Sequence, residues 1–522
     1  MHAALPNLAD YEVSDKTGFL PEQLPLESLT NPYYAPWEQV AQNLPALILT
    51  RRIRQYVDTR MPVLEIDQLK TPEEQRRAYS VLSFIAHAYI WGSPGDDPRD
   101  YIPPQITEPW VAISDLLELP PVCTYAGLCL WNHKTIMPVA SSDQWDLDSL
   151  ATITTYTGSF DESWFYLVST TMERQGGACI KAGLGAIAAA RENDFATVTS
   201  NLQYLAEAID AIITLLGRMY EMCEPHTFYH RLRPYLSGSE NMADRGLPHG
   251  VKYQTRADPD PKEYRAYAGG SNAQSSLIQT LDILLNVEHR ATGQRPTSKK
   301  DNSTRDASPP ASQATAPPKQ NNFIHEMRKY MPGPHRRFLE HLQQVAEIRD
   351  FVLANQAEHP EIVLAYDACL AMLRSFRDKH IQIVSRYIIL QAKEKAKTGI
   401  ALTAPAGPER GTGGTALIPF LKQARDETGD PAASSWGKRI LSDNFKSYQR
   451  PAGRPKKTKI SKPTEKIHSS SEDEDTREKN AVHLRQKIKH KVQNLEDNSE
   501  DENVGLAGNW ELGKDEGKII HW

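Results

Sequence analysis

The sequence predicts an all-α protein, and two patterns along the chain support that fold class. Apolar residues recur at spacings of three and four in several stretches, which is the period of a helix with one buried face. Strand-like alternation is scarce, and prolines separate the helical stretches without forming a repeat. We expect a small N-terminal helical domain over residues 1–110 and a large helical domain over residues 111–445.

The predicted helices follow one another along the chain. Apolar spacing marks a first helix at residues 81–89 and a second, longer one at residues 202–219. A shorter helix begins at residue 323 and stops at Pro332, because proline cannot continue a helix. The longest predicted helix covers residues 362–390, which contain neither proline nor glycine.

One histidine, His380, lies on the apolar face of this longest helix. The residues that share the face are Tyr366, Cys369, Leu373, Phe376, His380, Ile383 or Val384, and Tyr387. A buried imidazole needs a partner for each ring nitrogen, and no carboxylate lies one turn away on the same face. Two interpretations stay open from the residues alone: a core histidine bonded to a backbone carbonyl, or an iron ligand on the proximal side of a haem.

Composition excludes several classes of protein. The net charge of -6 offers no general case for nucleic-acid binding, and the five cysteines include no CxxC pair that would indicate structural zinc or a disulfide framework. The polar, acidic start MHAALPNLADYEVSDK resembles neither a secretory signal nor a transit peptide, and no apolar run approaches the ~20 residues of a membrane span. We expect a soluble, cytoplasmic protein with no nucleic-acid or membrane partner.

Two stretches are predicted to be disordered. Residues 290–320 contain almost nothing apolar beyond alanine, so they cannot bury enough surface to offset their ordering entropy, and they form an inserted loop. The tail, residues 446–522, passes from basic GRPKKTKISKPTEK to acidic HSSSEDEDTREK. Such a tail is typically solvated, although its basic cluster could serve nuclear import and its SSSEDED run could accept phosphate from an acid-directed kinase.

Eight stretches in one order resemble the indoleamine 2,3-dioxygenase family. They are SFIAHAYIWG (83–92), LELPPVCTYAGLCLWN (117–132), SFDESWFYLVS (159–169), FYHRLRPYLSG (228–238), YAGGSNAQSS (267–276), HEMRKYMPGPHRRFLEHL (325–342), FRDKHIQIVSRYI (376–388) and GTGGTALIPFLKQARDET (411–428). The resemblance covers residues 10–430 apart from the 290–320 insertion, and the insertion and tail indicate a fungal or otherwise divergent member. Members of the family are haem enzymes, so the resemblance favours the iron-ligand interpretation of His380.

The resemblance implies one haem b per chain in the large helical domain. His380 would be the protein ligand to iron, which leaves the opposite side open for dioxygen. Arg377, one turn earlier, would pair with a haem propionate through a charge-assisted hydrogen bond. Ser271, in the glycine-rich stretch AGGS, would lie near a propionate and the substrate amine.

The resemblance also implies a set of substrate-binding residues. They are Tyr125, Phe165, Ser169, Phe228, Arg233, Ser271 and Thr412. Arg233 would bind the substrate carboxylate by a two-pronged hydrogen bond, and Thr412 belongs to a loop that would close over the substrate. Phe228 and Arg233 are five residues apart, so they face one cavity only if their helix is bent or ends there, and Pro234 makes such an irregularity expected.

The implied reaction inserts both atoms of dioxygen across the indole 2,3 bond of L-tryptophan and yields N-formylkynurenine, a step of the kynurenine pathway towards NAD. No protein general base is expected, because no histidine or carboxylate falls at the matched positions. We expect a monomer served by an external electron donor that keeps the iron ferrous. Tyr166, Tyr229 and Asn272 depart from the vertebrate pattern, which leaves substrate affinity and stereoisomer preference open.

Two alternatives stay open at this point. A haem oxygen-binding protein of the same fold with little dioxygenase activity would keep His380 but would not need Arg233 as a carboxylate clamp. In the second alternative the charged tail is the functional part, and the helical body is a scaffold for nuclear or protein contacts. A haem absorption band in the purified protein would exclude the second alternative.

Overall fold

The computed structural model describes residues 2–137, 145–291, 323–393 and 417–441, and the backbone of two short antiparallel strands, β5 (Val504–Gly505) and β6 (Gly508–Asn509). The chain divides into two units, Met1–Arg450 and Pro451–Trp522. The first unit is mostly helical, which confirms the predicted all-α class. The domain boundary at residue 110 stays a prediction, and the insertion and tail lie almost entirely outside the described residues.

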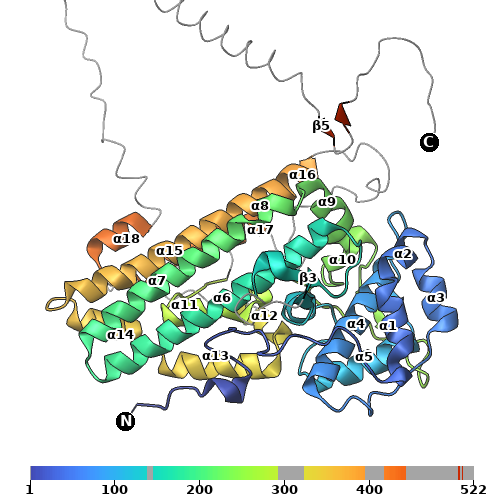
Figure 1. Cartoon of the computed structure of the whole chain (residues 1–522), viewed down its shortest axis with the longest axis horizontal. Helices are drawn as coiled ribbons and strands as arrows, with labels where there is room; N and C mark the ends of the chain where they lie inside the picture. Colours follow the sequence, from blue (N-terminus) through green and yellow to red (C-terminus); the bar gives the residue numbers. More distant parts are fainter. Residues whose placement is uncertain are drawn as a thin grey trace, which may run out of the picture. The chain divides into compact units, whose positions relative to one another are not determined.

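The N-terminal part of the first unit packs around helix α4 (Figure 1). Thr71 begins this helix with a capping box, in which its hydroxyl accepts from the Glu74 amide while the Glu74 carboxylate accepts from the Thr71 amide. The core residues of α4 are buried on all sides, which explains why apolar spacing predicted only its middle. The helices of this part are α1 (Ala35–Gln42), α2 (Leu44–Leu49), α3 (Ile53–Arg60), α4 (Pro72–Trp91) and α5 (Pro104–Leu116).

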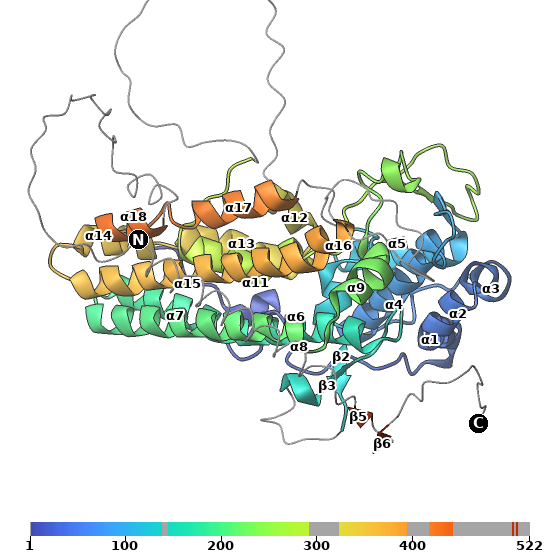
Figure 2. The same cartoon turned by 90° about the horizontal axis from the view of Figure 1, so that it is seen from above.

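Three long helices form the body of the larger part, and they lie side by side in both views (Figures 1 and 2). They are α6 (Phe160–Arg191), α7 (Phe195–Gly217) and α15 (Pro360–Val384). The predicted apolar faces of α7 and α15 are buried, so both helix predictions are confirmed. Helix α15 passes through a π-helical turn, η9 (Ser385–Ile389), into α16 (Leu390–Lys393), so the predicted helix continues to residue 390 with one change of period.

Shorter elements enclose these three helices. Helix α11 (Ser276–Leu284) packs across α6, while α17 (Leu417–Glu427) and α18 (Ser435–Leu441) pack on α15. The others are η1 (Leu8–Tyr11), η2 (Pro32–Tyr34), η3 (Ala126–Leu130), η4 (Leu147–Ser149), α8 (Met219–Met222), α9 (Pro225–Thr227), η5 (Phe228–Leu232), α10 (Arg233–Leu236), η6 (Ala243–Arg245), η7 (Asn272–Gln274), α12 (Phe323–Met327), η8 (Arg328–Tyr330), α13 (Gly333–Val345) and α14 (Ile348–Asn355).

Two small sheets join separate loops of the first unit. β1 (Tyr101–Ile102) pairs in parallel with β4 (Lys252–Tyr253), and β2 (His133–Thr135) pairs antiparallel with β3 (Leu150–Thr152). All five cysteines are buried and free. Within the described ranges, none of the helices combines the length and apolar character that crossing a bilayer requires.

Glycines on α6 allow neighbouring segments to approach its backbone. A Cβ added at Gly176 would lie 2.6 Å from a methyl group of Leu277 on α11. A Cβ at Gly177 would lie 2.8 Å from the carbonyl carbon of Lys16 and 2.9 Å from the carbonyl oxygen of Asp15. Because the second contact is with backbone, a change of rotamer cannot relieve it, and Gly177 therefore determines how closely the N-terminal segment packs on α6.

We predict that Gly177→Ala destabilises the protein. Alanine in place of a helical glycine gains roughly 1 kcal/mol, whereas forcing the backbone of residues 15 and 16 away costs about 1–3 kcal/mol. The matched control is Gly217→Ala, whose Cβ would make only ordinary contact at 3.6 Å with Lys379. Urea unfolding should show a lower midpoint for Gly177→Ala than for the parent and the control; an unchanged or higher midpoint would contradict this packing.

Candidate active site

Two adjoining cavities, of about 150 and 100 Å³, lie where α6, α7, α15 and α17 meet. Seven residues line both of them, so we refer to the two together as the paired cavity. The shared residues are Tyr125, Leu216, Asn272, Ala273, His380, Phe420 and Leu421. Every predicted site residue that the structure describes lines at least one of the two cavities; Thr412 lies outside the described residues.

His380 presents its ring to the paired cavity from α15. The side chain is partly exposed because the cavity lies against it, and no described residue forms a hydrogen bond with either ring nitrogen. Burial, assisted by the nearby Arg377 guanidinium, lowers the pKa of His380 to about 4. The imidazole is therefore neutral at pH 7, which is the form that binds a metal.

Arg377 lies one turn before His380 and lines the second cavity. One terminal nitrogen of its guanidinium donates to both carboxylate oxygens of Asp282, at 2.6 and 2.8 Å, and the other donates to the Thr428 hydroxyl. The predicted pairing of Arg377 with a haem propionate stays a prediction. In the structure, Asp282 and Thr428 hold this guanidinium at the edge of the paired cavity.

Aromatic side chains from two segments form one wall of the paired cavity. The rings of Phe165 and Phe228 lie 4.8 Å apart between centroids, with their planes inclined by 47°. Ser169, one turn after Phe165 on α6, donates its hydroxyl to the Phe165 carbonyl at 3.3 Å. This wall offers an apolar surface suited to a flat aromatic ligand.

Arg233 reaches the first cavity from an irregular segment. Phe228–Leu232 form a π-helical turn, η5, which confirms the predicted irregularity. Hydrogen bonds in a π-helix join residues five apart, so Phe228 and Arg233 come onto one side of the segment. The Arg233 guanidinium lies 5.2 Å from the Tyr229 ring centroid, and burial together with Arg245 lowers its pKa to about 10, which leaves it charged at pH 7.

The glycine-rich loop forms another wall, and a buried glutamine holds it in place. A Cβ added at Gly270 would lie 2.5 Å from a methyl group of Leu128, so the loop approaches the wall as closely as glycine allows. The Gln274 side chain donates to the Gly269 carbonyl and accepts from the Tyr125 amide, both at 2.9 Å. Ser271 lines the first cavity, and its hydroxyl accepts from the Ala273 amide at 3.3 Å.

Of the three departures from the vertebrate pattern, only Asn272 lines the paired cavity. The Tyr166 hydroxyl donates to Glu162 at 3.1 Å, away from the cavity. Tyr229 lies against the Arg233 guanidinium, so it acts on the cavity through that side chain. Asn272 is therefore the one of these three residues that a ligand in the paired cavity would contact directly.

The motif comparison missed Glu173, a buried carboxyl group on the wall of the second cavity. One oxygen accepts from the Tyr125 hydroxyl at 3.0 Å and from the Ser275 hydroxyl at 2.5 Å, and the other has no hydrogen-bond partner among the described residues. Burial raises the pKa of Glu173 to about 7. Its spacing of four from Ser169 on one helix was the signal in the sequence that could have identified it.

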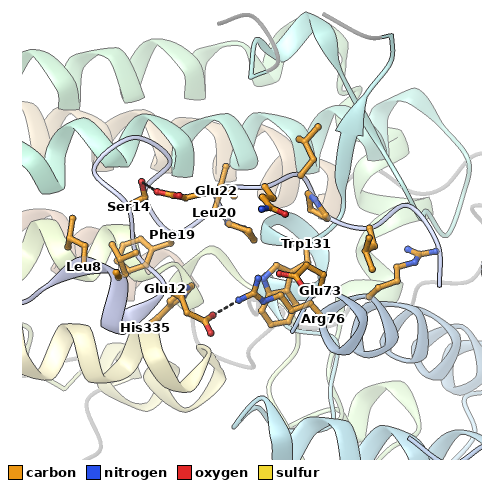
Figure 3. A pocket seen from close by; sticks show the side chains of 18 of the residues that line it. Leu8, Glu12, Ser14, Phe19, Leu20, Glu22, Glu73, Arg76, Trp131 and His335 are labelled. Atoms are coloured by element: carbon orange, nitrogen blue, oxygen red, sulfur yellow. Dashed lines mark hydrogen bonds and ion pairs between the residues drawn. The ribbon is translucent and has the colours of Figure 1, made fainter. Parts of the chain in front are cut away.

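A cavity of about 490 Å³, larger than either part of the paired cavity, lies elsewhere (Figure 3). The N-terminal segment, α4 and α13 line it, and a 2.5 Å ion pair between Glu12 and Arg76 crosses it. Arg76 also lies 5.9 Å from the Trp131 ring centroid. None of the predicted site residues lines this cavity, so its size does not make it the candidate active site.

The residues of the paired cavity fit a haem. His380 supplies a neutral imidazole that no described residue engages, and the surrounding walls are mostly apolar. Gly270 lets the loop approach closely, and the charged side chains of Arg233 and Arg377 line the cavity where anionic groups of a ligand could be bound.

The family follows from comparison with known proteins. The family model described as indoleamine 2,3-dioxygenase matches residues 7–431, and the chain belongs to that family. It is 40% identical to an indoleamine 2,3-dioxygenase of Saccharomyces cerevisiae over 81% of this chain and 93% of that one. It is 35% identical to a 6-hydroxytryptophan 2,3-dioxygenase of Fusarium equiseti (82% and 98%) and 33% identical to indoleamine 2,3-dioxygenase 1 of Mus musculus (82% and 96%). The resemblance stated from the motifs is confirmed, and the family indicates a dioxygenase.

We predict that Glu173→Gln stabilises the protein relative to the parent at high pH. A carboxyl group with a raised pKa releases its proton less readily when folded, so its stability contribution falls as pH rises from about 4.5 to about 7. The glutamine resembles the protonated carboxyl group and does not titrate. The difference in unfolding free energy should grow by up to about 3 kcal/mol between pH 4.5 and 8. A difference that does not change with pH, measured by urea unfolding, would contradict the assignment.

Proposed function

We propose that this chain is a haem-dependent dioxygenase that inserts both atoms of dioxygen across the indole 2,3 bond of L-tryptophan and yields N-formylkynurenine. The observation that supports this most strongly is that His380 and Arg233 line the same cavity. One offers a neutral imidazole for iron, and the other offers a guanidinium for a carboxylate. A protein that only carried oxygen would need the imidazole but not the guanidinium.

A bound haem would supply the iron chemistry that brings dioxygen into reaction with the indole ring. His380 would hold the iron, because its ring is neutral at pH 7 and faces the cavity. Haem b, one per chain, is our proposed cofactor. The protein's contribution is to orient the substrate and to exclude water from it.

The substrate would be oriented at both of its ends. Phe165 and Phe228 would pack against the indole ring, and Arg233 would bind the carboxylate. Ser271 and Asn272 would lie near the amine, because both line the same cavity as Arg233. Thr412 would belong to a loop that closes over the bound substrate, since its segment leads directly into α17.

Hydroxyl groups and one carboxyl group bring hydrogen-bonding capacity to the cavity. Tyr125 donates to Glu173, so its hydroxyl is fixed in orientation. Glu173 can hold a proton near neutral pH, because its pKa is raised to about 7. We propose no general base for the reaction, and we assign Tyr125 and Ser169 to lining and orientation.

The direct test uses the purified full-length chain. After anaerobic reduction, adding dioxygen and L-tryptophan should give the absorbance of N-formylkynurenine. A haem spectrum without product would instead support an oxygen-binding protein of the same fold.

We propose further that the protein is a cytoplasmic monomer in the kynurenine pathway that leads to NAD, and that it relies on an external electron donor.

We predict that His380→Ala folds but retains little haem, because the variant loses the proposed iron ligand. The control is His249→Ala, which alters an exposed histidine outside both cavities. Haem content is measured from the absorbance ratio of haem to protein, and folding from circular dichroism. A variant with the parent's haem spectrum and full activity would show that His380 does not hold the iron.

We predict that Arg233→Ala weakens L-tryptophan far more than tryptamine, which lacks the carboxylate. Losing a largely desolvated charged hydrogen bond costs on the order of 2–4 kcal/mol, or roughly 30- to 1000-fold in affinity. Arg245→Ala is the matched control, because Arg245 is a neighbouring arginine that lines neither cavity. Spectroscopic titration of both ligands gives the comparison; equal losses would mean that Arg233 only supports the fold.

A further inference from the structure

Four buried charged groups form a network beside the paired cavity. Asp282, His289, Arg377 and Glu427 have side chains that are only 5–9% exposed. Arg377 donates to Asp282, and His289 lies between Asp282 and Glu427. Two cations and two anions lie together, and their mutual attraction offsets the desolvation penalty of burying each charge.

Two carboxylates flank the His289 ring, and the Arg377 guanidinium also lies 3.3 Å from Nε2. Nε2 lies 3.0 Å from an oxygen of Asp282, and Nδ1 lies 2.8 Å from an oxygen of Glu427. Ionised carboxylates only accept hydrogen bonds, and a neutral imidazole has only one N–H to donate. The imidazolium donates to both carboxylates, whereas a neutral ring that donates to Glu427 has an unprotonated Nε2, which accepts from Arg377 and donates nothing to Asp282.

Glu427 is the last residue of α17, and the network anchors this end of the helix. Its second oxygen accepts from the Arg290 amide at 3.1 Å and from the Gln423 side chain at 2.9 Å. Gln423 also donates to the carbonyls of Arg290 and Ala291, both at 3.2 Å. The end of α17 is thus tied to the segment that follows α11.

The face of α17 that carries Glu427 also lines the cavity. Phe420, Ala424 and Glu427 are spaced by four and three, so they share one side of the helix. Phe420 lines both cavities, and Ala424 lines the second. The Phe420 ring also meets Phe323 edge to face, with centroids 5.0 Å apart. Holding Glu427 therefore fixes the position of a cavity wall.

We propose that His289 and Glu427 are positioning residues whose charge pair docks α17 onto the paired cavity, so that this wall loosens when His289 loses its proton. The docking of α17 is a property of the fold alone. Its consequence for ligand retention rests on the proposed function, because it assumes that haem occupies the cavity.

The direction of the pH dependence follows from the surroundings of His289. Among the described residues, the charged groups in contact with the pair are Asp282, Arg377 and Arg290. Glu288, His325 and Arg328 line an adjoining cavity together with His289. Although burial opposes the charge, Asp282 and Glu427 raise the pKa of His289 above its ordinary value. The pair of His289 and Glu427 contributes fully to stability below about pH 6.5, the pKa of histidine in the unfolded chain. This contribution is lost as pH rises through the pKa of His289 in the folded protein.

The test is hydrogen–deuterium exchange of the full-length chain between pH 6 and 9. The readout is the protection factor of α17 amides, which corrects for the intrinsic pH dependence of exchange. In the parent, protection of α17 should fall by about tenfold across this range, which corresponds to one lost charged hydrogen bond. His289→Gln and Glu427→Gln should start with lower protection and should lack this fall, and the double variant should resemble either single one.

The matched control is His359→Gln, since His359 is another histidine that contacts a carboxylate, Glu361 at 2.8 Å, at the far end of α15. This variant should keep the parent's pH profile. A parent whose α17 protection does not change with pH overturns the proposal, as does a normal fall in either network variant. If His289→Gln fails to fold, the parent profile and Glu427→Gln still decide the outcome.

A second measurement separates this proposal from the proposed function. Transfer of haem to an excess of a scavenging apoprotein should be several-fold faster from His289→Gln than from the parent or the control. Unchanged release with altered α17 protection would overturn the effect on retention and leave the docking intact. A chain that binds no haem would overturn the proposed function, while the exchange experiment would still test α17 docking.

Discussion

The cavity depends on the packing of α15 against α7 and α17, which lie on either side of it in Figure 2. This packing buries one face of α15. This face is apolar along most of its length, but near its end it carries Arg377 and His380. Burial removes water from both side chains, but it changes the protonation of only one of them. The imidazole becomes neutral, and the guanidinium, which cannot lose its proton, requires a buried carboxylate. One packing arrangement thus produces both a metal-binding nitrogen and the charged network beside it.

Two buried carboxyl groups near the cavity show how neighbours determine protonation. Despite its burial, Asp282 has a lowered pKa because Arg377 and His289 favour its charged form. Glu173 accepts hydrogen bonds from two hydroxyl groups, which compensate for burial only in part, so its pKa is raised. The first carboxylate can therefore hold charged groups together at neutral pH, whereas the second is only about half ionised there.

The helical period of the apolar residues predicted which face of a helix is buried, but it does not identify the residues that this face contacts. The spacing along 362–390 placed His380 on the buried side of α15, and Pro234 signalled the irregular segment that brings Phe228 and Arg233 together. The contacts between Asp282, His289 and Glu427 join residues up to 138 positions apart, and no local pattern specifies them. Glu173 went unnoticed for a related reason, because its partners Tyr125 and Ser275 lie 48 and 102 positions away and only the spacing from Ser169 marks it locally.

The two interpretations of His380 can be weighed against another histidine of the same chain. His87 is a core histidine with both nitrogens satisfied: Nδ1 meets the Tyr235 carbonyl at 2.8 Å, and Nε2 accepts from the Cys123 amide at 3.0 Å. Burial lowers the pKa of both histidines to about 4, so protonation does not distinguish them. Hydrogen bonding does, because no described residue offers His380 the carbonyl that the core interpretation needs, and its ring faces a cavity. The unpaired ring nitrogen would be satisfied by a group bound in the cavity itself. The iron of a haem is such a group.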